Sequence, residues 1–244
     1  MELAGKVATV SGGASGIGKA TSSALAARGV KVVIADLNKD GGQATVDLIV
    51  ENGGEAVFQY CDVTKTDDLV TLFDRAVSEY GSLDIAFNNA GIGEPDFFSD
   101  DLGRWKRVID INLIAVIEAT RLAVLTMRRG GKPGAIVNTS SIVGLWPMPL
   151  SPVYAAAKAG VIHFTRSLGY LKKDDEIRVN TICPELVDTP LVAPMGDEYL
   201  AKARAEGNIL QPEEIAAAVI ELIEDESRAG AVMTIMTAEG RSYV

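Results

Sequence analysis

The segment KVATVSGGASGIGKA, residues 6–20, decides the fold. Its first five residues form an apolar, β-branched run typical of a buried strand, and four glycines then lead into a helical pattern. Glycine lets a backbone turn sharply and approach a ligand without a Cβ in the way. The amino end of the following helix offers unpaired N–H groups and a positive dipole end to a pyrophosphate. This strand, glycine turn and helix therefore predict a dinucleotide-binding unit.

Asp36 closes the next strand candidate, 18 residues after the last of these glycines, near the spacing expected of a ribose-binding carboxylate. A carboxylate accepts hydrogen bonds from ribose hydroxyls but repels a 2′-phosphate, so the sequence favours NAD over NADP. Ser15 and Leu37, where a compensating cation would stand, are uncharged. Lys19 and Lys39 lie close by in the sequence and leave NADP open as the alternative.

Short β-branched runs alternate with amphipathic runs along the whole chain, which predicts βαβ units. We expect strands at 6–10, 31–35, 56–61, 83–88, 134–140, 177–183 and 231–237. We expect helices near 15–28, 39–52, 66–80, 101–129, 152–171 and 212–225. The prediction is an α/β fold: one Rossmann-type domain over 1–244, with a doubly wound parallel sheet of about seven strands and helices on both faces. The long connection at about 190–210 follows a strand's carboxyl end and is interpreted as a substrate-loop insertion.

Composition narrows the possible partners and the cellular compartment. The 33 acidic and 23 basic side chains give a net charge of −10, which argues against nucleic acid or anionic membrane as the main partner. No apolar run approaches the roughly 18 residues of a membrane span, and the first residues lack a secretory-signal pattern. Cys61 and Cys183 end apolar runs, so we expect buried thiols and a cytoplasmic protein. No Cys/His cluster indicates a metal, and His163 is interpreted as a packed or surface residue.

The stretch SPVYAAAKAGVIHF, residues 151–164, carries Tyr154 and Lys158 four residues apart on a predicted helix. Four residues span about one helical turn, so the two side chains can meet. Taken alone, the pair is equally compatible with a packed tyrosine beside a solvated lysine.

Further motifs supply the context. The glycine spacing G-x-x-x-G-x-G, NNAG at 88–91, DINL at 110–113, NTSS at 138–141 and Y-x-x-x-K follow one another in order. In this combination the chain resembles the short-chain dehydrogenase/reductase family. FTRSL, VNTICPELVDTPL, ILQPEEIA and ELIEDESRAGAVMTIMT in the last third are similar to the NAD-linked 15-hydroxyprostaglandin dehydrogenase branch, although the glycine-rich tail of many relatives is missing.

The resemblance implies four catalytic residues: Asn112, Ser141, Tyr154 and Lys158. Ser141 is indicated rather than Ser140 because the family's serine lies 13 residues before its tyrosine. It implies these cofactor-binding residues: Gly12, Ser15, Gly16, Ile17, Gly18, Asp36, Leu37, Asp62, Val63, Asn89, Tyr154, Lys158, Val187 and Thr189. It also implies a homodimer or homotetramer built on the helices at 101–129 and 152–171.

Two positions depart from the family pattern. Glu185 stands where the family usually has glycine, so its side chain must either point away from the nicotinamide or narrow the site. Ser151 stands where the prostaglandin enzymes have a substrate-contacting glutamine, which weakens the case for a prostaglandin substrate.

The chemistry explains the spacing. A free phenol has a pKa of about 10 and is a poor base near neutral pH, and lowering that pKa by about 2–3 units takes roughly 3–4 kcal/mol. We expect Lys158 and the oxidised nicotinamide to supply the positive charge, Ser141 to hold the substrate oxygen, and Asn112, by resemblance, to position a water. The prediction is an NAD-dependent dehydrogenase of a small apolar secondary alcohol or ketone, such as a hydroxylated lipid, steroid or terpenoid.

Several alternatives stay open. The chain could be an NADP-linked ketoreductase or a non-catalytic nucleotide-sensing regulator. Asp62 could serve only to cap the helix that begins near Thr64. One apolar set is compatible either with a substrate-pocket wall or with the core: Trp146, Met148, Leu150, Leu186, Leu191, Met195 and Tyr199.

Overall fold

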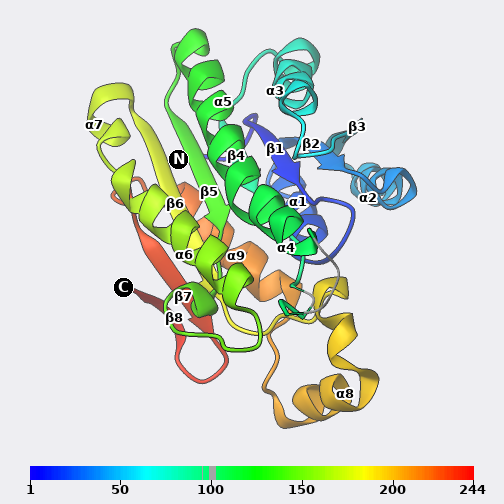
Figure 1. Ribbon diagram of the computed structural model, residues 1–244. Coiled ribbons are helices and arrows are strands. Elements are labelled where there is room, and N and C mark those ends of the chain that lie inside the picture. Colours follow the sequence, from blue (N-terminus) through cyan, green and yellow to red (C-terminus); the bar gives the residue numbers. More distant parts are fainter. Residues whose placement is uncertain (95, 99–102) are drawn as a thin grey trace.

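The computed structural model describes residues 1–94, 96–98 and 103–244, and one sheet organises it (Figure 1). The strand order is β3-β2-β1-β4-β5-β6-β7-β8. The bounds are β1 Val7–Ser11, β2 Lys31–Asp36, β3 Glu55–Tyr60, β4 Ile85–Asn88, β5 Gly134–Thr139, β6 Ile177–Pro184, β7 Val232–Met236 and β8 Gly240–Tyr243. Strands β1 to β7 pair in parallel, which confirms the predicted doubly wound fold. β8 pairs antiparallel with β7 and was not predicted.

Helices cover both faces of the sheet. Their bounds are α1 Gly16–Ala26, α2 Lys39–Glu51, α3 Thr66–Tyr80, α4 Arg104–Ile109, α5 Ala115–Gly130, α6 Pro152–Ser167, α7 Leu171–Asp175, α8 Asp197–Glu206 and α9 Pro212–Glu224. Figure 1 shows α5 and α6 in front of the sheet and α9 behind it. Successive strand residues alternate between the two layers: Val32 and Ile34 pack with α1, α2 and α9, whereas Val33 and Ala35 pack with α3 and α5. This two-sided burial explains why the strands read as continuous apolar runs.

Three predicted segments differ from the structure. Of the helix expected at 101–129, residues 101 and 102 lie outside the described residues, and the rest consists of α4, a π-helical turn at Asp110–Ile114 and α5. The helix expected at 152–171 ends at Ser167, and α7 follows separately. The connection at 190–210 holds a 3₁₀ helix, Pro190–Met195, and α8, which begins and ends beside glycines with positive φ.

The topology brings the polar motifs to one edge of the sheet. The order reverses between β1 and β4, and in open α/β sheets the ligand crevice lies outside the carboxyl ends of the strands at that point. Asn88 ends β4, Thr139 ends β5 and Pro184 ends β6, so the motifs that follow these strands share that edge.

Arg178 on β6 fixes the carboxyl end of α9. Its guanidinium is 5% exposed and donates to the backbone oxygens of Leu222, Ile223 and Asp225. A cation at this position satisfies carbonyls that have no partner within the helix and complements the helix dipole. Burial lowers the pKa of Arg178, an energetic cost that these bonds must offset.

We expect Arg178→Met to lower the free energy of unfolding by about 3 kcal/mol, because it leaves buried carbonyls without donors. The matched control is Arg75→Met, which breaks only the exposed Arg75–Glu79 ion pair and should cost under about 1 kcal/mol. Denaturant titration of both variants measures the difference, and equal losses would show that Arg178 does not hold α9.

Candidate active site

The glycine turn after β1 admits no larger side chain. A Cβ on Gly18 would lie 2.1 Å from the Gly12 carbonyl oxygen, and one on Gly16, where φ is +49°, would lie 2.9 Å from Thr189 Cγ2. Ser15 occupies the N-cap of α1, and no side chain caps that helix end. The turn therefore presents backbone at close range to a helix N-terminus, an arrangement that fits a pyrophosphate.

Asp36 holds the glycine turn in place. Its Oδ2 accepts from the Ala14 N–H at 3.0 Å and its Oδ1 from the Asn38 N–H at 2.9 Å. A carboxylate oxygen has two lone pairs, so each oxygen retains one for a ribose hydroxyl. Ile17 is half-buried against the core, and Leu37, directly after Asp36, is exposed.

Asn89 connects the glycine turn to the neighbouring strands. Its Nδ2 donates to the Ser11 carbonyl oxygen at 3.1 Å, and its Oδ1 accepts from Thr139 Oγ1 at 3.3 Å. The side chain thus links the ends of β1, β4 and β5, and both polar atoms of its amide are hydrogen-bonded within the protein.

Asp62, Val63 and Val187 are three further residues that the sequence predicts to bind the cofactor. Asp62 Oδ1 accepts from the Thr64 hydroxyl at 2.7 Å and from its N–H at 3.1 Å, and these bonds lower the pKa of Asp62. The Asp62 carboxylate therefore caps the turn that precedes α3. This role is similar to the helix-capping role that the sequence left open for Asp62. Val63 packs against the core beside α3, and Val187 is buried and bridges to Leu210.

Lys158 lies deep between α6 and β5. It is 2% exposed, and its Nζ donates to the Thr139 carbonyl oxygen at 2.9 Å. Burial lowers the pKa of Lys158 to about 8. The Lys158 nitrogen lies 5.4 Å from the centre of the Tyr154 ring. Ser140 Oγ donates to the Lys158 carbonyl oxygen at 2.7 Å, so this hydroxyl has a structural role.

The acidity of Tyr154 is set by burial. Burial around its hydroxyl raises the pKa of Tyr154 to about 12, and a hydrogen bond with Ser141 lowers it by less. The Lys158 ammonium is hydrogen-bonded to the Thr139 carbonyl oxygen. The lowering of the Tyr154 pKa by Lys158 together with the oxidised nicotinamide stays a prediction. Ser141 Oγ also donates to the Pro184 carbonyl oxygen at 3.3 Å, so Ser141 joins Tyr154 to the end of β6.

Asn112 lies in the π-helical turn between α4 and α5 and is fully buried. Its Nδ2 donates to the Ile92 carbonyl oxygen at 2.9 Å, and its Oδ1 accepts from the Ile92 N–H at 3.2 Å. Single π-helical turns often mark functional sites. A Cβ on Gly91 would lie 2.8 Å from Asn112 Oδ1 and 3.8 Å from Lys158 Nζ, so Gly91 separates these groups at close range. The water-positioning role of Asn112 stays a prediction.

Glu185 turns away from the cofactor side. Its Oε2 accepts from the Thr237 N–H at 2.9 Å and from Thr237 Oγ1 at 3.1 Å. The carboxylate therefore faces the turn between β7 and β8. Of the two orientations expected from the sequence, the side chain takes the one that points away from the nicotinamide position.

Sequence reasoning missed Glu94. Its Oε2 accepts from the Tyr154 backbone N–H at 2.7 Å, in the first turn of α6, where the N-cap residue Ser151 makes no side-chain cap. Glu94 follows NNAG at the carboxyl end of β4, and the placement of polar residues at that edge is the signal that identifies it.

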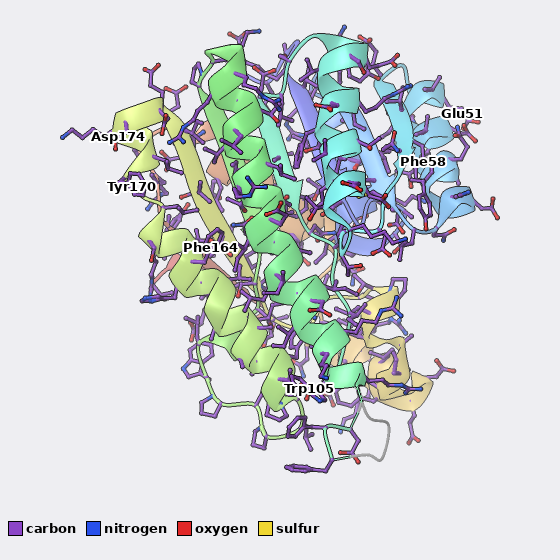
Figure 2. The ribbon with its side chains drawn as sticks, turned by 45° about the horizontal axis from the view of Figure 1, so that its top comes forward. Glu51, Phe58, Trp105, Phe164, Tyr170 and Asp174 are labelled. Atoms are coloured by element: carbon purple, nitrogen blue, oxygen red, sulfur yellow. The ribbon has the colours of Figure 1, made fainter. Side chains whose placement is uncertain are left out.

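Apolar side chains are exposed near the start of α6. Trp146 is 52% and Leu150 81% exposed, so neither belongs to the core. Leu191, Met195 and Tyr199 are also exposed, whereas Leu186 packs against α8. Figure 2 shows Trp105, at the start of α4, at the same end of the molecule as the start of α6.

Other expectations from composition can be checked on the described residues. Cys61 and Cys183 are buried free thiols, and His163 is exposed, as expected. Within the described ranges, no three acidic, cysteine or histidine side chains gather as a metal site. None of the helices seen there is both long and apolar enough to cross a bilayer.

The lowered pKa of Lys158 predicts a pH-dependent stability. Between about pH 8 and 10.5 the unfolded lysine binds a proton that the folded one has lost, so stability rises with pH. We expect the unfolding free energy of the wild type, relative to Lys158→Met, to increase by about 2 kcal/mol from pH 8 to pH 10. Denaturant titrations at the two pH values test this, because groups common to both proteins cancel in the difference. A constant difference would contradict the assigned burial of the charge.

Known proteins share the sequence pattern and the fold of this chain. The crystal structure of a short-chain type dehydrogenase/reductase from Mycobacterium marinum matches with a TM-score of 0.91 and 30% identity, over 97% of this chain and 96% of that chain. The chain is 39% identical over 224 residues to cyclohexanol dehydrogenase from Acinetobacter sp. (strain SE19), covering 91% of this chain and 89% of the relative. It is 37% identical over 259 residues to the 15-hydroxyprostaglandin dehydrogenase [NAD(+)] of Mus musculus, covering 98% and 93%.

The relatives confirm the resemblance predicted from the motifs. A family model described as short chain dehydrogenase matches residues 6–200, a range that holds the glycine turn, the Tyr154–Lys158 pair and the start of α8. By its sequence and its structure, the chain belongs to the short-chain dehydrogenase family.

Proposed function

We propose that this protein is an NAD-dependent oxidoreductase that transfers hydride between a secondary alcohol or ketone and the cofactor. One observation carries the proposal: on a single turn of α6, the Lys158 nitrogen lies 5.4 Å from the centre of the Tyr154 ring. The helix and the end of β5 hold these groups at the edge where the glycine turn lies.

In the direction of oxidation, the alcohol loses a proton from oxygen and a hydride from carbon. The oxidised nicotinamide, when bound, supplies the hydride acceptor and a positive charge. Ser141 orients the substrate oxygen beside Tyr154, which in its phenolate form takes the alcohol proton and becomes a neutral phenol as the carbonyl forms. Burial disfavours the phenolate form of Tyr154. The positive charge of the nearby Lys158 favours that form, so it offsets part of the cost of burial. With a pKa of about 8, Lys158 itself can hold or release a proton near neutral pH.

The residues around Asp36 support NAD. Lys39 packs its ammonium over the Tyr60 ring at 5.1 Å, and Lys19 lines a groove beside Asp188 and Glu213. Lys39 is thus engaged with the Tyr60 ring, and each Asp36 oxygen keeps one lone pair for a ribose hydroxyl. The NADP-linked ketoreductase remains the runner-up.

Exposed apolar side chains near α6 support an apolar substrate. The two named relatives act on cyclohexanol and on a hydroxyprostaglandin, both of which are secondary alcohols. We therefore place the substrate among secondary alcohols with a largely apolar carbon skeleton and their ketones. Apolar residues exposed near α4 and α5, Ile114 and Leu125, support a homodimer or homotetramer. A cytoplasmic location stays a prediction of the sequence.

We expect Tyr154→Phe to lower kcat by 10²-fold or more, because the proton acceptor is lost, while the affinity for NAD changes less than about threefold. Formation of reduced cofactor across a panel of secondary alcohols measures the first effect, and calorimetry measures the second. Tyr170→Phe, on the exposed ring before α7, is the control and should keep full activity. Full activity in Tyr154→Phe would remove the phenol from the mechanism, and cofactor binding without turnover in the wild type would favour the regulator.

We expect the double variant Asp36→Ala, Leu37→Arg to shift the ratio of kcat/KM for NAD to that for NADP by at least about 100-fold toward NADP. The change removes the charge that repels a 2′-phosphate and adds a cation near it. Asp40→Ala, which removes an exposed carboxylate in the first turn of α2, should leave the ratio unchanged. A wild-type protein that already prefers NADP would contradict the role given to Asp36.

A further inference from the structure

A short 3₁₀ helix, Ile142–Gly144, begins directly after Ser141, just beyond the carboxyl end of β5. Ser141 is its N-cap residue, and the Ser141 carbonyl oxygen accepts from the Gly144 N–H at 3.0 Å. The Ser141 hydroxyl also accepts from the Val143 N–H at 3.4 Å. Ser141 and Gly144 therefore belong to one hydrogen-bonded turn, and a shift of this turn moves both residues.

Gly144 lies directly against the backbone of α6. A Cβ at this position would lie 2.7 Å from the Lys158 carbonyl carbon and 2.8 Å from the Ala159 nitrogen, and both distances are too short for an unstrained contact. The two atoms belong to one peptide bond inside a helix, so they cannot turn aside as the end of a flexible side chain can. Only glycine therefore allows the 3₁₀ helix to approach α6 this closely.

Other contacts hold the 3₁₀ helix and α6 together at this separation. Ser140 Oγ donates to the carbonyl oxygen of Lys158, the same residue that Gly144 approaches, at 2.7 Å. Ile142 and Leu145 pack against a buried cluster that includes Ile162 of α6. The hydrogen bond and the apolar contacts draw the two elements together, and the Gly144 contact sets how close they come.

We propose that Gly144 is a positioning residue, because its missing side chain sets the separation between Ser141 and Tyr154. The inference rests on the proposed dehydrogenase function, in which these two residues meet the substrate oxygen. Ser141 moves with the 3₁₀ helix, and Tyr154 moves with α6. Whichever element gives way to a larger side chain at position 144, the two residues move apart. A displacement of about 1 Å at a reacting centre can lower a rate by about 100-fold.

The first test compares Gly144→Ala with two glycine controls. We expect Gly144→Ala to lower kcat at least about tenfold, whereas the affinity for NAD, measured by calorimetry, should change less than about threefold. Gly130→Ala adds a Cβ that meets no atom within 4 Å, and it should keep full kcat. Gly134→Ala, at the amino end of β5, places a Cβ 2.3 Å from Met127 Sδ, so it should lower the melting temperature but keep kcat within about twofold. Equal losses of kcat in Gly144→Ala and Gly134→Ala would overturn the inference, because they would reflect a general loss of packing.

A double variant tests whether Gly144 acts through Ser141. Without the Ser141 hydroxyl its separation from Tyr154 no longer matters, so Gly144→Ala added to Ser141→Ala should lower kcat less than about twofold further. Independent effects would multiply instead, and a multiplied loss would overturn the inference. Ser140→Ala keeps the glycine but removes the hydrogen bond to the Lys158 carbonyl oxygen. It should lower kcat about threefold, again without multiplying the effect of Ser141→Ala, and it replaces Gly144→Ala if that variant does not fold.

Crystal structures supply a readout that does not require turnover. The distance between the Cα atoms of Ser141 and Tyr154 should be longer in Gly144→Ala than in the wild type by several tenths of an ångström, because a Cβ at 2.7 Å must move to about 3.4 Å for an ordinary contact. An unchanged distance would overturn the inference whatever the activity of the variant. Failure of the proposed function looks different: the wild type then oxidises no alcohol of the panel, and the distance still decides the role of Gly144.

Discussion

The buried hydrogen bond from the Lys158 ammonium to the Thr139 carbonyl is the interaction on which the site depends. It joins α6 to the end of β5 and sets the distance between the cation and the Tyr154 ring. Burying this charge is unfavourable, as the lowered pKa of Lys158 shows. The surrounding structure tolerates it because Ser140 holds the same helical turn from β5 and because a sheet buried on both faces supplies the remaining stability. Such a locally unfavourable group is typical of a catalytic site.

Most of the fold could be predicted because its signals are local. Apolar runs of strand length alternate with amphipathic runs of helix length, and the glycine turn marks the first βα connection. β8 could not be predicted, since its sequence, GRSY, is polar. It is held by contacts with distant residues: the Tyr243 hydroxyl donates to Glu221, and Arg228 stacks 3.4 Å from the Tyr243 ring centre. The π-helical turn could not be predicted from the sequence either, because it forms where Asn112 is hydrogen-bonded to Ile92, a residue 20 positions earlier in the chain.

The identity of the main residues of the candidate site could be predicted from the sequence, but their burial and their contacts could not. Spacing and resemblance identify Tyr154 and Lys158, and the structure brings them together. The rise of the Tyr154 pKa by burial could not be predicted, because a sequence shows which charges are present and not how much water surrounds them. Glu94 was missed because its contact with α6 joins segments 60 residues apart. The orientation of Glu185 depended in the same way on a strand far along the chain.

The bond between Glu185 and Thr237 links two parts of the chain that a sequence diagram would keep apart. Glu185 directly follows β6 and opens the segment that reaches Thr189 beside the glycine turn, while Thr237 begins the turn into the terminal hairpin. The β7–β8 hairpin therefore holds in place the segment that follows β6 and reaches Thr189. A substitution that shifts β8 against β7 would move Thr237, and the displacement would reach the segment after β6 without a change in any residue predicted to bind the nucleotide.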